Sequence, residues 1–146
     1  MSITPSIDWA LLHQQAEQVC GNAYAPYSHF KVGAALQTVD KQIFVGCNIE
    51  NASYGLTVCA ERNCIAAAVA KGNKNIVALV VFTPQIELTT PCGACRQVIA
   101  EFMAPNAIVG LVNHLGDTKQ WLVSELLPAA FTPKALVNSN QPSDSH

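Results

Sequence analysis

Charged residues are scarce in this sequence of 146 residues. Only 12% are Asp, Glu, Lys or Arg, and the net charge is −2. The eight Lys and Arg are scattered, without the basic run that a nucleic-acid-binding surface needs to neutralise phosphates. We therefore expect a small, uncharged ligand and no nucleic acid. Half of the residues are hydrophobic, and so weakly charged a surface indicates that part of it is buried between subunits.

Long apolar runs are also missing. No stretch approaches the ~20 consecutive apolar residues of a membrane-spanning helix. Residues 1–5 have neither the basic start nor the apolar run of a secretory signal. Six cysteines without such a signal indicate a reducing compartment. We expect a cytoplasmic protein that makes no contact with membranes.

The apolar pattern predicts one domain over residues 1–137 and a disordered polar tail over 138–146. Helices are predicted over 6–22, 59–71 and 91–103, and strands over 30–38, 43–49, 76–83, 107–113 and 119–123. Strand–helix–strand units predict parallel pairing late in the sheet, and the first two strands form an antiparallel hairpin. The expected fold is α/β: a three-layer α/β/α sandwich with a mixed five-stranded sheet.

Three cysteines, Cys59, Cys92 and Cys95, lie at the starts of two predicted helices. Cys92 and Cys95 are three residues apart, so on a helix they share a face. A helix N-terminus lowers the pKa of a thiol, and the thiolate is the form that binds metal. The three cysteines therefore predict a Zn²⁺ site. Because three protein ligands leave the fourth position to water, the predicted site is of the catalytic rather than the structural type.

The two helix starts are predicted from their capping residues. Thr57 and Thr90 are candidate N-caps, and Pro91 suits the first position of a helix. Both predicted helices would then begin close to their cysteines.

Glu61 follows Cys59 by two residues, so its carboxylate can reach the water without binding zinc. The pattern Cys-x-Glu with a later Pro-Cys-x-x-Cys is the signature of zinc-dependent base deaminases. A closed structural zinc, with Cys47 or Cys64 as the fourth ligand, is the alternative. Glu61 together with Pro91 favours the catalytic interpretation.

Asn48 and Glu50 lie at the end of the predicted strand 43–49. They are two residues apart, so on an extended chain both point to one face. An amide and a carboxylate aimed together suit the hydroxyl groups of a ligand. A polar loop with turn-forming Asn residues explains them equally well.

Several stretches between residues 24 and 131 are similar to those of the small homotetrameric cytidine deaminases. They are Ala25-Pro26-Tyr27-Ser28, Phe30-Lys31-Val32-Gly33-Ala34-Ala35, residues 48–54, Cys59-Ala60-Glu61-Arg62, residues 91–98 and residues 126–131. The resemblance implies hydrolytic deamination of cytidine, and of deoxycytidine, to uridine or deoxyuridine and ammonia in pyrimidine salvage. It also implies a homotetramer that uses Zn²⁺.

The same resemblance implies a role for each matching residue. The zinc ligands are Cys59, Cys92 and Cys95, and Glu61 moves protons between water and base. The substrate-binding residues are Phe30, Asn48, Glu50, Ala60 and Phe131, of which Phe131 reaches the site of a neighbouring subunit. Cys64 stands where a small apolar residue is usual, and we interpret it as a packing residue.

Arg62 follows Glu61 and can turn toward a cysteine sulfur. Three thiolates on Zn²⁺ carry an excess of negative charge, which a nearby cation offsets. The alternative for Arg62 is an exposed charge on the helix surface. Arg96 is a weaker candidate for the same role.

Two other interpretations remain at this point. The first is a deaminase of another substrate: a nucleotide, a tRNA or DNA base, or an aminonucleoside antibiotic. The first two need cations that this sequence does not place together, and only the stretch 48–51 argues against the third. The second is a non-catalytic, zinc-stabilised interaction module, which would need a fourth protein ligand.

Overall fold

The computed structural model describes residues 5–137, so the predicted tail 138–146 lies outside the described residues. Five strands form one sheet in the order β2-β1-β3-β4-β5. Their bounds are β1 Gly33–Thr38, β2 Ile43–Cys47, β3 Ile76–Thr83, β4 Met103–Asn113 and β5 Thr118–Leu122. Only β3 and β4 pair in parallel, and the other neighbours are antiparallel. The predicted mixed five-stranded sheet is confirmed.

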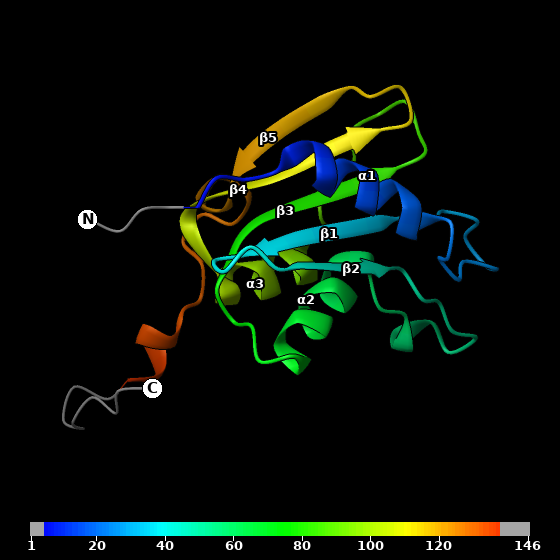
Figure 1. The fold of residues 1–146 in the computed structure, drawn as a ribbon. Helices are drawn as coiled ribbons and strands as arrows, with labels where there is room; N and C mark the ends of the chain where they lie inside the picture. Colours follow the sequence, from blue (N-terminus) through cyan, green and yellow to red (C-terminus); the bar gives the residue numbers. More distant parts are fainter. Residues whose placement is uncertain (1–4, 138–146) are drawn as a thin grey trace.

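Helices cover both faces of this sheet, with α1 on one side and α2 and α3 on the other (Figure 1). The helices are α1 Trp9–Cys20, α2 Ala60–Ala70, α3 Gly93–Phe102 and α4 Val123–Leu126, with 3₁₀ turns η1 Tyr54–Leu56 and η2 Pro133–Leu136. The predicted three-layer sandwich is confirmed. No helix within residues 5–137 combines the length and the apolar character that crossing a bilayer requires.

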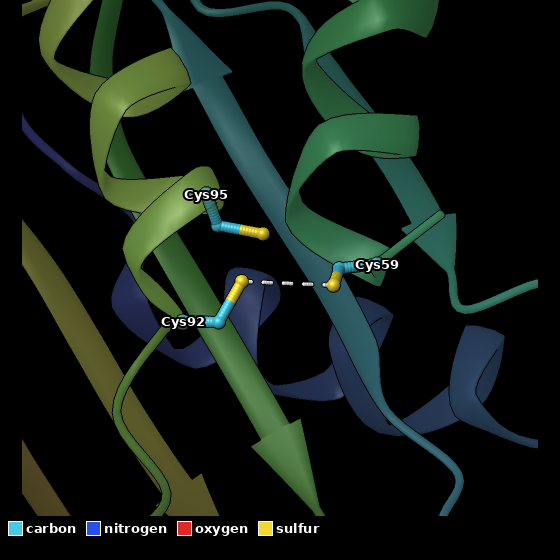
Figure 2. Close-up of side chains that lie close together, drawn as sticks. All are labelled: Cys59, Cys92 and Cys95. Carbon is cyan, nitrogen blue, oxygen red and sulfur yellow. Dashed lines mark hydrogen bonds between the residues drawn. The ribbon is translucent and has the colours of Figure 1, made fainter. Parts of the chain in front are cut away.

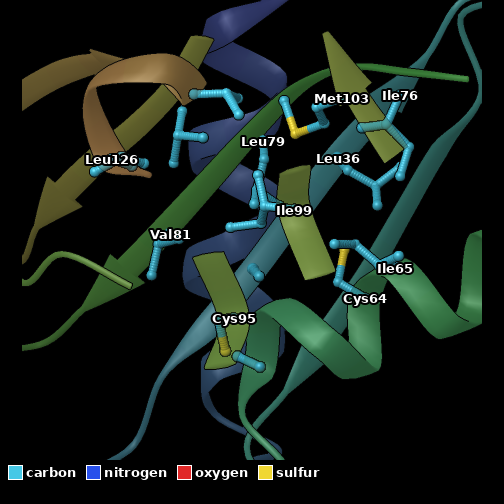
Figure 3. Close-up of a cluster of buried hydrophobic side chains, with 14 of the residues drawn as sticks. Leu36, Cys64, Ile65, Ile76, Leu79, Val81, Cys95, Ile99, Met103 and Leu126 are labelled. Atoms are coloured by element: carbon cyan, nitrogen blue, oxygen red, sulfur yellow. The ribbon is translucent and has the colours of Figure 1, made fainter. Parts of the chain in front are cut away.

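The central strand β3 supplies both hydrophobic cores. Successive side chains of a strand point to opposite faces, so Leu79 and Val81 pack under α2 and α3 (Figure 3). Val80 and Phe82 pack under α1. Strand β3 was predicted as a continuous apolar run buried on both faces. Its side chains contact the helical layer on each side of the sheet and so join the two layers.

Two strand starts differ from the prediction by three residues or more. The strand expected to begin at Phe30 begins at Gly33, and the one expected to begin at residue 107 begins at Met103. Pro105 has no backbone N–H, and it lies where the pairing of β4 with β3 is interrupted, between Met103 and Ile108. The proline therefore interrupts the ladder without ending the strand.

Helix α2 lies so close to β2 that Gly46 has no space for a side chain. A Cβ there would lie 2.4 Å from the backbone nitrogen of Cys64 and 2.8 Å from the carbonyl oxygen of Ala60. These are backbone atoms of α2, which cannot turn aside as a flexible side chain can. The close approach therefore sets the position of the first turns of α2.

We expect Gly46→Ala to lower the free energy of unfolding by about 1–3 kcal/mol, because the added methyl group must push α2 away from β2. The zinc content should fall as well, since Cys59 directly precedes α2. Denaturant unfolding and metal analysis of the purified protein measure the two effects. The control is Gly21→Ala, whose Cβ would have its nearest neighbour at 3.4 Å. Equal stability of the two variants would contradict the prediction.

Candidate metal centre and substrate pocket

Helices α2 and α3 each begin directly after a cysteine. Cys59 is the N-cap of α2, with φ −71° and ψ 157°, and Cys92 is the N-cap of α3, with φ −67° and ψ 167°. Cys95 lies in the first turn of α3. All three thiols therefore lie where a helix presents unpaired N–H groups and the positive end of its dipole.

The predicted N-caps Thr57 and Thr90 are wrong, although the helix starts themselves were placed within two residues. Thr57 is the residue that ends η1, and Thr90 lies two residues before the N-cap of α3. Pro91 precedes that N-cap instead of occupying the first helical position. Cys59 and Cys92 have the extended backbone of an N-cap residue, and neither side chain makes a capping hydrogen bond.

The three sulfur atoms converge between the two helix starts (Figure 2). All lie within 4.8 Å of one another, and the Sγ atoms of Cys59 and Cys92 are 3.8 Å apart. Thiolates bound tetrahedrally to zinc at about 2.3 Å lie about 3.8 Å from each other. The arrangement therefore fits Zn²⁺ held by three cysteines.

Neither Cys47 nor Cys64 joins this cluster, and within residues 5–137 no other Cys, His, Asp or Glu does. The buried Cys64 instead donates its S–H to the carbonyl oxygen of Phe44, at 3.2 Å. The predicted packing role of Cys64 agrees with this position. The four-cysteine alternative has no support in the described part of the chain.

Arg62 is directed at the sulfur cluster. Its Nη2 donates to Sγ of Cys59 at 3.5 Å. Contact with Cys95, and to a smaller extent with Arg62, lowers the pKa of Cys59 well below its usual range, which favours the thiolate that metal binding needs. The structure thus places Arg62 beside the ligands rather than in solvent, while its effect on the chemistry stays a prediction.

Glu61 is the second residue of α2 and is only 4% exposed. Burial is the main cause that raises the pKa of its carboxyl group, and the charge of Cys59 raises it further, whereas Arg62 opposes the rise. A raised pKa makes the carboxylate a stronger base, so it accepts a proton more readily and holds it nearer to neutral pH than an exposed carboxylate does. It is therefore suited to serve as both a base and an acid.

A pocket of about 180 Å³ opens beside the cluster. The predicted site residues in its wall are Phe30, Asn48, Cys59, Ala60, Glu61 and Cys92. The rest of the described wall is Val and Thr, with no Lys or Arg. Such a wall suits a small ligand without phosphate.

Asn48 and Glu50 make hydrogen bonds within the chain. The amide of Asn48 accepts from the N–H of Val32 at 2.8 Å and donates to the carbonyl oxygen of Phe30 at 2.7 Å. The carboxylate of Glu50 accepts from two backbone N–H groups, at 3.0 and 3.1 Å, and from the hydroxyl group of Ser28. These bonds fasten the segment before β1, which carries Phe30.

The two residues line adjoining hollows rather than one. Asn48 lines the pocket beside the sulfur cluster, and Glu50 lines a second hollow of about 390 Å³ with Tyr27 and Tyr54. Thr57 belongs to both walls. A ligand that contacts both predicted residues must extend past Thr57.

Phe131 does not line either hollow of its own chain. Its side chain is 59% exposed, and its carbonyl oxygen accepts a hydrogen bond from Nε2 of Gln97 at 3.0 Å. The structure of one chain therefore leaves the ring available to another molecule.

The sequence did not indicate the residues that fix the helix starts. Arg96 donates from Nε to the carbonyl oxygen of Pro91 at 2.8 Å and from Nη1 to that of Leu126 at 2.9 Å. Asn63 donates to the carbonyl oxygen of Cys47 at 2.8 Å. Arg96 thus holds the segment before Cys92 instead of donating to a cysteine sulfur. Hydrogen bonds of this kind, to backbone carbonyl groups, cannot be predicted from a local sequence pattern.

Three converging thiols at two helix starts, with a buried carboxyl group beside them, define a zinc-dependent hydrolytic deaminase. Residues 8–111 match the family model described as the cytidine and deoxycytidylate deaminase zinc-binding region. The chain belongs to the cytidine and deoxycytidylate deaminase family, which confirms the resemblance found in the sequence.

Individual relatives agree with this assignment. The chain is 48% identical over 126 residues to a cytidine deaminase of Halalkalibacterium halodurans, covering 86% of this chain and 96% of the relative. For one of Sporosarcina psychrophila the identity is 44% over 130 residues, covering 89% and 96%. The crystal structure of cytidine deaminase from Burkholderia pseudomallei superposes with a TM-score of 0.81 at 45% identity, covering 86% of this chain and 100% of that one.

We expect Arg62→Ala to move the acid limb of the pH–rate profile to higher pH. The charge of Arg62 lowers the pKa of Glu61, so without it the carboxyl group keeps its proton to a higher pH and becomes a base only there. The measurement is kcat/KM as a function of pH. The control is Lys71→Ala, which removes an exposed cation at the other end of α2. An unchanged profile in Arg62→Ala would show that this charge does not act on the site.

Proposed function

We propose that this chain hydrolyses cytidine, and also deoxycytidine, to uridine or deoxyuridine and ammonia in pyrimidine salvage. The observation that carries the proposal is the buried carboxyl group of Glu61 in the wall of a pocket that has no Lys or Arg and also contains Cys59 and Cys92. The relatives at 48% and 44% identity are named cytidine deaminases.

Zinc, when held by Cys59, Cys92 and Cys95, supplies the Lewis acid that makes a water molecule acidic near neutral pH. Glu61 accepts a proton from the attacking water and transfers it to N3 of the cytosine ring. The oxygen adds to C4, which becomes tetrahedral. Glu61 then takes the remaining proton of that oxygen to the amino group, the C4–N bond breaks, and ammonia leaves. One carboxyl group thus serves first as base and then as acid.

Phe30 and Ala60 would contact the base, and Asn48 and Glu50 the sugar. The amide of Asn48 is held by the backbone of Phe30 and Val32. It keeps one N–H and one oxygen lone pair for a hydroxyl group. The hydrogen bonds to Val32 and Phe30 are made within the chain, so they fix the orientation of the Asn48 amide before a nucleoside binds.

We also propose that residues 1–137 form one deaminase domain and that the protein is cytoplasmic. It would assemble as a homotetramer in which each active site receives Phe131 from a neighbouring subunit. The exposed ring of Phe131 supports this arrangement, as do the exposed side chains of Tyr27 and Tyr54, which line the hollow that contains Glu50. Exposed aromatic side chains of this kind are typical of buried subunit contacts.

The direct test follows the loss of cytosine absorbance when cytidine is added to the zinc-loaded protein. In Glu61→Gln we expect kcat to fall by at least about 10²-fold, because this is the usual cost of losing a general acid–base group. The zinc content should stay normal. Glu101→Gln, which changes an exposed carboxylate on α3, is the control and should match the unaltered protein. Near-normal turnover by zinc-replete Glu61→Gln would contradict the role of Glu61 as the general acid and base.

Complementation tests whether Phe131 acts in a neighbouring subunit. Chains with Glu61→Gln and chains with Phe131→Ala are prepared separately, dissociated, mixed and reassembled. If Phe131 acts in trans, some hybrid sites combine an intact Glu61 with an intact Phe131, and we expect activity to return. If it acts within its own chain, no hybrid holds a complete site. Activity that stays at the parental level after demonstrated subunit exchange would refute the shared site.

A further inference from the structure

Thr83, the last residue of β3, has a buried hydroxyl group that the chain leaves without a partner. Its side chain is 2% exposed, and Oγ1 makes no hydrogen bond within residues 5–137. Thr38, at the end of β1, is 1% exposed, but its hydroxyl group bonds to Asp40 and accepts from the N–H of Gln42 at 3.1 Å. A buried hydroxyl group without a partner costs stability, so the exception at Thr83 needs a cause.

The side chain of Thr83 lies on the face of β3 that borders the pocket beside the sulfur cluster. Side chains alternate along β3, and Leu79 and Val81 point toward α2 and α3. Thr83 continues that series, and both Val81 and Thr83 belong to the pocket wall. The unpartnered group therefore lies at the place where a substrate would bind.

Strand pairing places Thr83 at the far end of the pocket from Asn48. Cys47, Gly33 and Phe82 are paired in one row across β2, β1 and β3. Asn48, Val32 and Thr83 are their neighbours along the chain, and all three line the pocket. Asn48 and Thr83 are thus separated by two strand spacings, roughly 10 Å between their backbones.

This separation assigns the two residues to different parts of a nucleoside. With the sugar near Asn48 and the adjoining hollow of Glu50, the other end of the ligand lies toward Thr83 and Cys92. That end carries the reacting base. A hydroxyl group can both donate and accept, so it can pair with the polar edge of a pyrimidine before and after the amino group is replaced by oxygen.

We propose that the hydroxyl group of Thr83 makes a hydrogen bond to the pyrimidine ring of the substrate. The inference rests on the proposed deamination of cytidine and adds a residue to its binding site. The free protein tolerates the unpaired hydroxyl group, and the nucleoside supplies the missing partner.

The test compares Thr83→Val, Thr83→Ser and a control, Thr38→Val. Thr83→Val replaces the hydroxyl group by a methyl group of similar shape. We expect kcat/KM for cytidine and for deoxycytidine to fall equally, by about tenfold or more, as for a lost buried hydrogen bond. Zinc content should stay full. The melting temperature without nucleoside should be unchanged or higher, because an unsatisfied group has been removed.

The two companion variants separate binding from structure. Thr83→Ser keeps the hydroxyl group and should stay within about threefold of the unaltered protein in kcat/KM. Thr38→Val loses bonds that the free protein makes, so it should melt at a lower temperature with unchanged kcat/KM. A purely structural role for Thr83 would instead make Thr83→Val behave like Thr38→Val.

Three results would overturn the inference. They are an unchanged kcat/KM in Thr83→Val, a lowered melting temperature or zinc content in that variant, and a loss for cytidine alone, which would put the hydroxyl group on the sugar. Failure of the proposed function looks different, since the unaltered protein itself would then not deaminate cytidine.

Discussion

The site depends on one constraint: the first turns of α2 and α3 must lie side by side at the same end of the sheet. Neither helix could hold the three thiols alone, because Cys59 precedes one helix while Cys92 and Cys95 belong to the other. The sheet sets the distance between them. The missing side chain at Gly46 lets α2 settle onto β2, and the hydrogen bonds of Arg96 hold the chain that enters α3.

The same end of the sheet also organises the pocket. The residues just past β2 and just before β1 are tied together by the amide of Asn48, whose two bonds reach Phe30 and Val32. Glu50 ties the preceding turn in the same way through Ser28. Side chains expected to meet the sugar are therefore also the supports of the segment that carries Phe30. A change at Asn48 would alter the shape of the pocket as well as a contact to the ligand.

Local patterns in the sequence predicted the elements whose causes are local. The bounds predicted for the strand 76–83 are those of β3, because the continuous apolar run that is buried on both faces has clear ends in the sequence. The cysteine cluster followed from spacing and from a familiar signature. The N-caps did not follow, since propensity favoured Thr57 and Thr90 while the extended backbone falls on Cys59 and Cys92. The orphan hydroxyl group of Thr83 depends on contacts from several segments, which no local pattern encodes.

The separation of the sulfur atoms along the chain has a consequence for folding. Cys59 and Cys92 are 33 residues apart, and α2 and β3 lie between them. A metal ion held by both thiols therefore acts as a cross-link, which closes a loop around a helix and the central strand. Closing such a loop removes conformational freedom mainly from the unfolded chain. The metal that equips this protein for chemistry also ties α2 to α3 within one helical layer, so that metal loading and the completion of the fold are thermodynamically linked.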